Sequence, residues 1–214
     1  MTIATWHPPG QNPPSLNHRG EQSAAFLYAA AGRALSEWEQ TESALMEVFQ
    51  VLCETSSLAA THAFSTIGTA QGRRAALAAA AEEFFRRRRA TSGTNVEAQE
   101  KAVGALLKAY ETASTCRSNI AHGVAEQPNG HGYFLCAQPI VGKKRPKSAV
   151  PAQTWPSGTA YFYKVSDIEE CARRFVAIRE QAMRLVIALS VARRVHRPPR
   201  VQLWGAGGDH ERHG

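Results

Sequence analysis

Two residues near the middle of the chain have side chains suited to chemistry on a phosphate ester. Arg117 and His122 lie five residues apart in the stretch CRSNIAHGV, residues 116–124. Histidine exchanges a proton near neutral pH, and arginine is a permanent cation whose forked donors match phosphate oxygens. Such a pair can move a proton and stabilise negative charge growing on a phosphate without a metal ion.

The spacing of apolar residues places this pair at the end of a helix predicted from about 95 to 122. Its inward residues are Val103, Leu106, Leu107, Tyr110 and Ala113. Arg117 continues this apolar face, whereas His122 lies on the polar side, before the typical helix stop Gly123. The two side chains are about 140° apart around the helix axis. They can line one groove if the helix ends near His122, or if a twofold axis brings the same segment of a second copy alongside.

Three further long helices are predicted from the same periodicity. They run from about 23 to 54, from about 57 to 90 after the candidate caps Ser56 and Ser57, and from Ser166 to about 196. Their inward residues are Leu35, Trp38, Leu45, Phe49 and Leu52; Ala60, Phe64, Ile67, Leu77, Ala81 and Phe84; and Ile168, Phe175, Ile178, Leu185 and Leu189. The predicted fold is mainly all-α, a four-helix up-and-down bundle.

An insertion at 127–165 separates the third and fourth long helices. Two β-prone runs, 133–141 and 159–165, predict a β-hairpin-like structure whose tip is basic and rich in proline. The aromatic residues of these runs can stack on nucleic-acid bases or pack the hairpin against the bundle. They are Tyr133, Tyr161, Phe162 and Tyr163.

The 214 residues are enough for one core and predict a single helical domain at 21–196. Residues 1–20, which contain two Pro-Pro pairs, are expected to form a flexible N-terminal arm. Residues 197–214, which begin with prolines and end in glycine and histidine, are expected to form a flexible C-terminal tail.

Three charged residues fall on the predicted apolar faces: Glu42, Arg74 and Arg117. A buried charge without a partner is unfavourable by several kcal/mol. Glu42 is therefore expected to neutralise one of the two arginines, which leaves the other without an acid partner. His122 has an interpretation without chemistry, because a histidine at a helix C-terminus interacts favourably with the helix dipole.

The stretch RSNIAHG resembles the signature of the HEPN superfamily (higher eukaryotes and prokaryotes nucleotide-binding). In that signature a histidine follows an arginine by four to six residues, near the end of the third helix of a four-helix bundle. The resemblance covers residues from about 25 to 195. Many members have Asn, Asp or His directly after the arginine, whereas this chain has Ser118 there and Asn119 one position later.

The resemblance implies a metal-independent endoribonuclease that acts as a homodimer. It assigns His122 as the general acid and base, Arg117 as the group that stabilises the transition state, and Asn119 as a positioning group. Either Asn119 or Ser118 can hold a phosphate or orient the imidazole ring. Glu42 is a candidate to orient Arg117 from the first helix.

The net charge of +7 predicts attraction to a polyanion such as RNA. Basic residues are concentrated in two segments that can guide RNA toward the groove. They are Arg86, Arg87 and Arg88, continuing to Arg89, and Lys143, Lys144 and Arg145, continuing to Lys147. The alternative for each cluster is an ordinary solvated surface.

Other classes of site have no support in the sequence. The four cysteines are far apart, so neither a zinc site nor a disulfide framework is indicated, and no metal or cofactor is expected. The longest apolar run is too short to span a bilayer and no secretory signal is seen, so a cytoplasmic protein without membrane contact is expected.

The functional hypothesis is therefore a HEPN-type endoribonuclease that cleaves RNA by 2′-hydroxyl attack at a dimer-interface site. It includes a role as a toxin or antiviral defence effector that a regulatory protein partner holds inactive. The alternative is a catalytically inactive HEPN-like dimer that serves as an RNA- or protein-binding scaffold.

Overall fold

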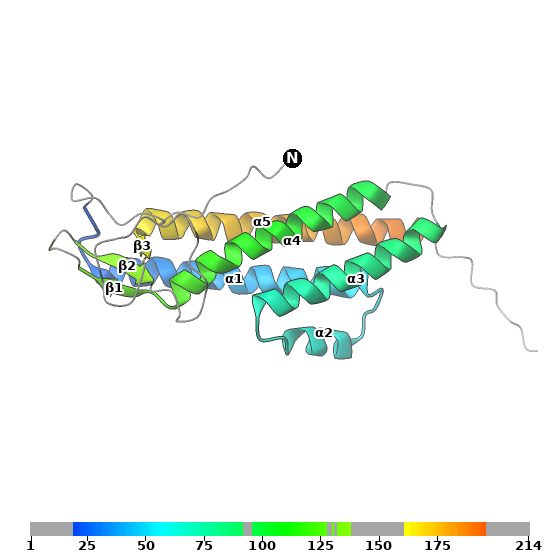
Figure 1. Ribbon diagram of the computed structural model, residues 1–214, viewed down its shortest axis with the longest axis horizontal. Coiled ribbons are helices and arrows are strands. Elements are labelled where there is room, and N and C mark those ends of the chain that lie inside the picture. The colour runs from blue at the N-terminus through cyan, green and yellow to red at the C-terminus, as the bar shows by residue number, and fades with distance from the viewer. Residues whose placement is uncertain (1–18, 92–95, 128–129, 131, 138–160, 196–214) are drawn as a thin grey trace, which may run out of the picture.

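The computed structural model describes residues 19–91, 96–127, 130, 132–137 and 161–195, which form a helical bundle with a small sheet at one end (Figure 1). The predicted tail, nearly all of the predicted arm and most of the insertion lie outside the described residues. The helices are α1 (Ala24–Leu52), α2 (Leu58–Ser65), α3 (Ala70–Thr91), α4 (Val96–Ala121) and α5 (Val165–Val195). The strands are β1 (Val124–Glu126), β2 (Phe134–Ala137) and β3 (Tyr161–Tyr163).

The prediction of a mainly helical bundle is confirmed, but the predicted second helix is two helices. The side chain of Ser57 accepts a hydrogen bond from Ala59 N, so this candidate cap does begin α2. The chain leaves the helix after Ser65, and Thr69 Oγ1 accepts from Gly72 N over 3.1 Å at the start of α3. A hydroxyl cap of this kind satisfies a helix-terminal N–H that has no helical partner.

The expected up-and-down topology is wrong, because α1 and α3 run in the same direction. Glu42 pairs with Arg73 and, further along both helices, Glu54 pairs with Arg87. In Figure 1 α2 runs back beside α1, so the chain has already returned when α3 begins. A short connection would make two consecutive long helices antiparallel. Here α2 and its two loops form a crossover between α1 and α3, which are therefore parallel.

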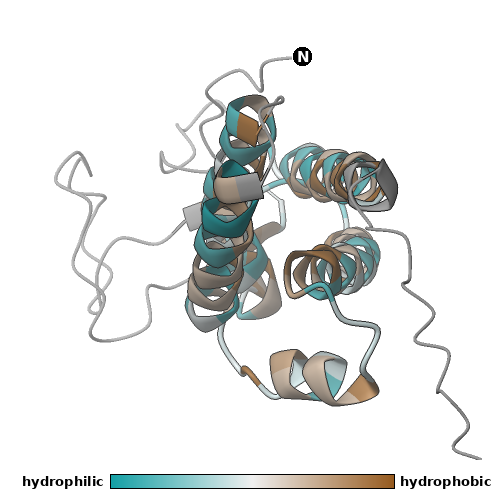
Figure 2. Ribbon diagram, turned by 90° about the vertical axis from the view of Figure 1, so that its right-hand side faces the viewer, coloured by the Kyte–Doolittle hydropathy of each residue, from teal (hydrophilic) through white to brown (hydrophobic). Residues whose placement is uncertain are grey.

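The remaining long helices complete the bundle around a common interior (Figure 2). α4 is antiparallel to α3, since Arg74 contacts Glu111 while Arg89 contacts Glu100. α5 is parallel to α1 and packs along its length. Small residues on α1 allow a close approach, and the buried Thr41 hydroxyl donates to Phe175 O on α5 over 2.9 Å.

Aromatic residues fill the centre of the bundle. The Trp38 ring stacks on Tyr110 with centroids 5.2 Å apart and meets Phe175 edge-on at 5.1 Å. These contacts join α1, α4 and α5, as the inward assignments of Trp38 and Phe175 predict. α2 lies outside the group of long helices and contributes the buried Phe64 to the core.

The sheet lies where α4 ends, and it is antiparallel with the order β1-β2-β3. The predicted pairing of two β-prone runs is confirmed over a shorter length, with Leu135 opposite Tyr163. β1 was not predicted, because three residues directly after a helix carry almost no alternation. Its Val124 pairs with Cys136, which connects the end of α4 to the rest of the sheet.

Candidate functional site

The position of His122 is set by the end of α4. The helix ends at Ala121, and His122 N still donates to Ser118 O over 3.2 Å in the last turn. His122 is exposed. The next residue, Gly123, has little space for a side chain, because a Cβ there would lie only 2.6 Å from Leu135 Cγ. The prediction that the helix ends near His122 is confirmed.

Arg117 is a half-buried cation that has no acid partner in the part of the chain that the structure describes. Its Nε is buried and has no hydrogen-bond partner, and no ion pair joins Arg117 to any described residue. Every other helical arginine with a described side chain pairs with a glutamate, apart from Arg88, which lies 4.6 Å from the centroid of the Phe84 ring. Desolvating an uncompensated charge is unfavourable, so this arrangement suits an anionic ligand.

Asn119 is held by the sheet. Its Nδ2 donates to Tyr163 Oη over 2.7 Å, and Tyr163 is only 1% exposed. Asn119 is half-buried, as is Ser118, whose carbonyl oxygen accepts from the His122 amide. The amide of Asn119 is thus oriented by a residue 44 positions later in the chain.

Glu42 does not pair with Arg74 or contact Arg117, contrary to expectation. The Glu42 carboxylate is 8% exposed, lies 2.5 Å from Arg73 Nη1 and accepts from Tyr110 Oη over 2.7 Å. Burial, together with the adjacent Glu42 carboxylate, raises the pKa of Tyr110 far above its usual range. Tyr110 precedes Arg117 by seven residues, which corresponds to about 10 Å along α4. The predicted role of Glu42 as an orienting group for Arg117 therefore has no contact to support it.

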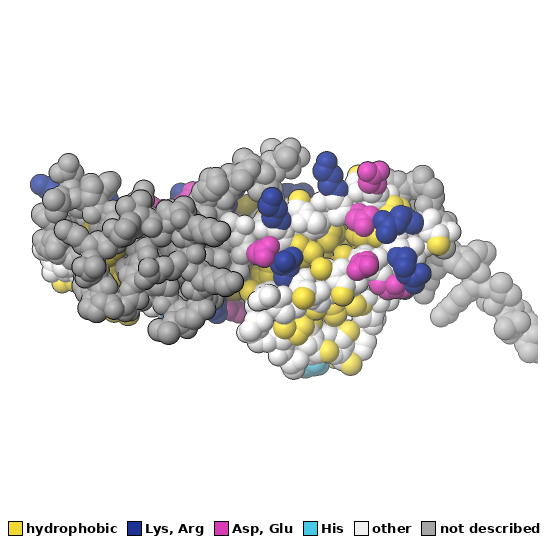
Figure 3. All heavy atoms as spheres, in the orientation of Figure 1, with side chains coloured by type: hydrophobic (Ala, Val, Ile, Leu, Met, Phe, Trp, Pro, Cys, Tyr) yellow, Lys and Arg dark blue, Asp and Glu magenta, His cyan; other side chains and the backbone are white. Residues whose placement is uncertain are grey.

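The predicted basic cluster on α3 lies away from the motif. Arg89 contacts Glu100, and the 17 residues from there to Arg117 span about 25 Å of helix. Arg86 pairs with Glu83, and Arg87 pairs with both Glu83 and Glu54. Figure 3 shows acidic side chains beside the basic ones on this face of the bundle. The cluster is therefore largely neutralised, and Lys143, Lys144 and Arg145 lie outside the described residues.

Two side chains near the end of α4, Val124 and Tyr28, expose apolar surface. Val124 follows Gly123 and is about half exposed. Tyr28 of α1 is also half exposed, and its hydroxyl accepts from Ala125 N over 3.1 Å. Nothing in the sequence pattern of α1 marks Tyr28, because its place beside β1 depends on how the helices pack. Tyr163 is buried in the core of the bundle, which confirms the packing interpretation for this aromatic, whereas Phe162 is buried with Phe134 and Cys136 in a separate cluster.

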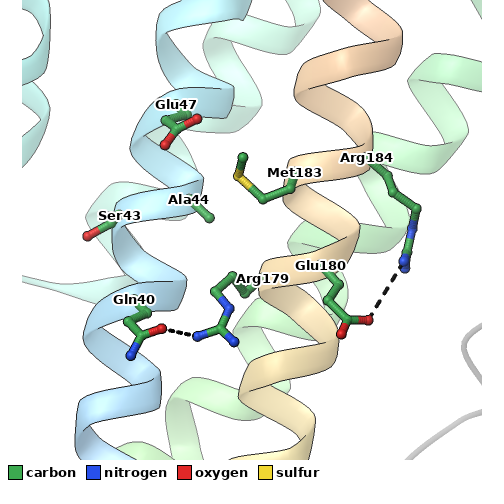
Figure 4. A pocket seen from close by; sticks show the side chains of 8 residues that line it. All are labelled: Gln40, Ser43, Ala44, Glu47, Arg179, Glu180, Met183 and Arg184. Atoms are coloured by element: carbon green, nitrogen blue, oxygen red, sulfur yellow. Dashed lines mark hydrogen bonds and ion pairs between the residues drawn. The ribbon is translucent and has the colours of Figure 1, made fainter.

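A shallow depression of about 480 Å³ lies between α1 and α5 (Figure 4). Its arginines are engaged: Arg179 bonds to Gln40 and Glu37, and Arg184 pairs with Glu180. The depression is separate from the motif, and its lining contains no histidine or cysteine. We therefore centre the candidate site on the end of α4.

Within the described ranges, no group of three or more His, Cys, Asp or Glu residues could hold a metal ion. No helix among the described residues has the length and apolar character needed to cross a membrane. Searches against models of protein families, curated proteins and solved structures find no match to the chain. The functional conclusion therefore depends on the geometry around Arg117, Asn119 and His122.

Proposed function

We propose that this protein is a metal-independent endoribonuclease of the HEPN type. The observation that carries the proposal is Arg117, a half-buried guanidinium that pairs with no acid among the described residues, five residues before an exposed imidazole at the end of α4. A cation available to a phosphate and a group that exchanges protons are the two groups that phosphate-ester chemistry requires.

In the proposed reaction His122 accepts the proton of a ribose 2′-hydroxyl. The 2′-oxygen attacks the adjacent phosphorus, and Arg117 stabilises the negative charge that grows on the phosphate oxygens. The bond from phosphorus to the 5′-oxygen breaks, and the proton passes to that oxygen. The products are a 2′,3′-cyclic phosphate and a free 5′-hydroxyl.

A homodimer is part of the proposal, since one copy of the motif places its two side chains on different sides of the helix axis. The half-exposed Tyr28 and Val124 support it, because they provide apolar surface beside His122 that a second copy can cover. A twofold axis there would bring Arg117 of one copy toward His122 of the other. The position of the motif at the end of the third long helix is a further point of agreement with the HEPN pattern.

Cleavage of single-stranded RNA by the purified full chain in EDTA tests the proposal. The wild type is expected to cleave, and His122→Ala and Arg117→Ala are expected to lower the rate by at least about a hundredfold. His62→Ala is the matched control, because His62 is also exposed in the last turn of a helix. Equal cleavage by wild type and His122→Ala would contradict the proposal.

Two further outcomes separate related functions. RNA binding without cleavage, unchanged by His122→Ala, would favour a catalytically inactive scaffold. Growth arrest on expression that Arg117→Ala relieves would favour a toxin or antiviral effector. Sedimentation of the variants beside the wild type shows whether the oligomeric state has changed.

A further inference from the structure

The bond between Asn119 and Tyr163 determines which atom of the Asn119 amide is available to a ligand. Nδ2 donates to the buried Tyr163 hydroxyl over 2.7 Å. The carboxamide group is planar, so Oδ1 lies on the other side of Cγ from Nδ2 and faces away from Tyr163. No described residue donates to Oδ1, although Asn119 is half-buried.

Tyr163 is well placed to fix this orientation. It pairs with Leu135 in the sheet, and the Leu135 side chain in turn lies where a Cβ of Gly123 would be. Both Tyr163 and Leu135 are buried. The hydroxyl that bonds to Asn119 is therefore part of the packed core, and the Asn119 side chain is held beside β3.

A free carbonyl oxygen accepts hydrogen bonds and repels a phosphate oxygen, which is itself an acceptor with negative charge. Of the groups on an RNA backbone, the ribose 2′-hydroxyl is the donor, and DNA lacks it. Asn119 precedes His122 by three residues, so the two side chains lie about 60° apart on the same side of α4, and a strand whose ribose reaches His122 passes close to Asn119.

We propose that Tyr163 positions Asn119 so that Oδ1 accepts a hydrogen bond from a ribose 2′-hydroxyl of the bound strand. Asn119 is then the residue that selects RNA over DNA, and it does not hold the phosphate. This inference rests on the proposed function, and it adds Tyr163 as a positioning residue.

The test measures the affinities of one labelled sequence as RNA and as DNA by fluorescence anisotropy. The full chain carries His122→Ala, so that the RNA stays intact. In this parent RNA is expected to bind about tenfold tighter than DNA, because only RNA makes the additional hydrogen bond. Asn119→Ala and Tyr163→Phe are each expected to remove most of that preference, and the double variant is expected to lose no more than either single variant.

Tyr133→Phe is the matched control, because Tyr133 is a half-buried tyrosine directly before β2, the strand that pairs with β3, and its hydroxyl makes no hydrogen bond to Asn119. It is expected to keep the preference for RNA. Thermal melting is expected to show that Tyr163→Phe remains folded, since the ring is retained. A general loss of structure would lower both affinities together, whereas loss of positioning lowers the affinity for RNA alone.

The outcomes separate this inference from the proposed function. If the protein with His122 cleaves RNA but Tyr163→Phe retains the full preference, the positioning role is overturned and the nuclease stands. A preference lost in Tyr163→Phe but kept in Asn119→Ala also overturns it. A parent that binds neither RNA nor DNA, or binds both equally, overturns the inference directly, and absence of cleavage by the wild type overturns the proposed function.

Discussion

Arg73 Nη1 on α3 lies 2.5 Å from Glu42 Oε2 on α1, so the carboxylate expected to pair with Arg74 or Arg117 pairs with Arg73 instead. The carboxylate is nearly buried and also accepts from Tyr110. Glu42, the acidic residue predicted to pair with Arg74 or Arg117, is therefore engaged with Arg73 and Tyr110. The guanidinium of Arg117 has no carboxylate among the described residues and is available to a phosphate.

Replacing Arg117 is expected to separate stability from activity. Arg117→Met keeps the apolar stem and removes a half-buried charge without a partner, so the free energy of unfolding is expected to rise by about 1 kcal/mol. Cleavage of RNA is expected to be lost in the same variant. Urea denaturation measures the first effect. A decrease of about 2 kcal/mol or more would instead mean that Arg117 has a structural role.

Replacing Glu42 is expected to have the opposite effect on stability. Glu42→Gln leaves the half-buried Arg73 and the buried Tyr110 without their acceptor charge, so a loss of about 2 to 4 kcal/mol is expected. Glu169→Gln is the control, because its pair with Arg33 is largely exposed and should contribute less than about 1 kcal/mol. Chemical denaturation of the two variants under one condition gives the comparison, and equal losses would contradict it.

The raised pKa of Tyr110 predicts a loss of stability at high pH. The unfolded chain releases this phenol proton near its usual pKa of about 10, whereas the folded chain retains it. The contribution of Tyr110 is therefore fully present below about pH 10 and is lost above it, by about 1.4 kcal/mol for each pH unit. Denaturation midpoints of the wild type are expected to fall more steeply above pH 10 than those of Tyr110→Phe. Parallel curves would argue against the burial of this hydroxyl beside Glu42.

The contact between the end of α4 and β2 can be tested with two glycines. In Gly123→Ala the new Cβ would lie 2.6 Å from Leu135 Cγ and 3.1 Å from Asn119 O, so a loss of about 1 to 3 kcal/mol is expected. Gly104→Ala, within α4, meets no atom within 4 Å and is expected to gain about 0.5 to 1 kcal/mol. Thermal melting distinguishes the two signs, and a stabilised Gly123→Ala would show that β2 does not pack there.

Much of the local structure could be predicted from the sequence. Apolar spacing located the ends of α1, α4 and α5 closely, because burial of one helix face requires that spacing. Gly123 marked the end of α4, and the β-prone runs marked β2 and β3. The short β1 was missed, since three residues carry too little alternation to be recognised.

Only the tertiary structure decided which elements and side chains meet. Periodicity shows that Glu42 and Arg117 face inward, but it contains no information about their partners, and the crossover through α2 brings Arg73 to Glu42. The contact of Asn119 with Tyr163 likewise depends on where the sheet folds back onto α4. The sequence by itself determined the buried faces of the long helices and the ends of α1, α4 and α5, because these follow from local chemistry. The directions of the helices, the partners of the charged side chains and the absence of a described acid partner for Arg117 follow from packing between segments far apart in the chain.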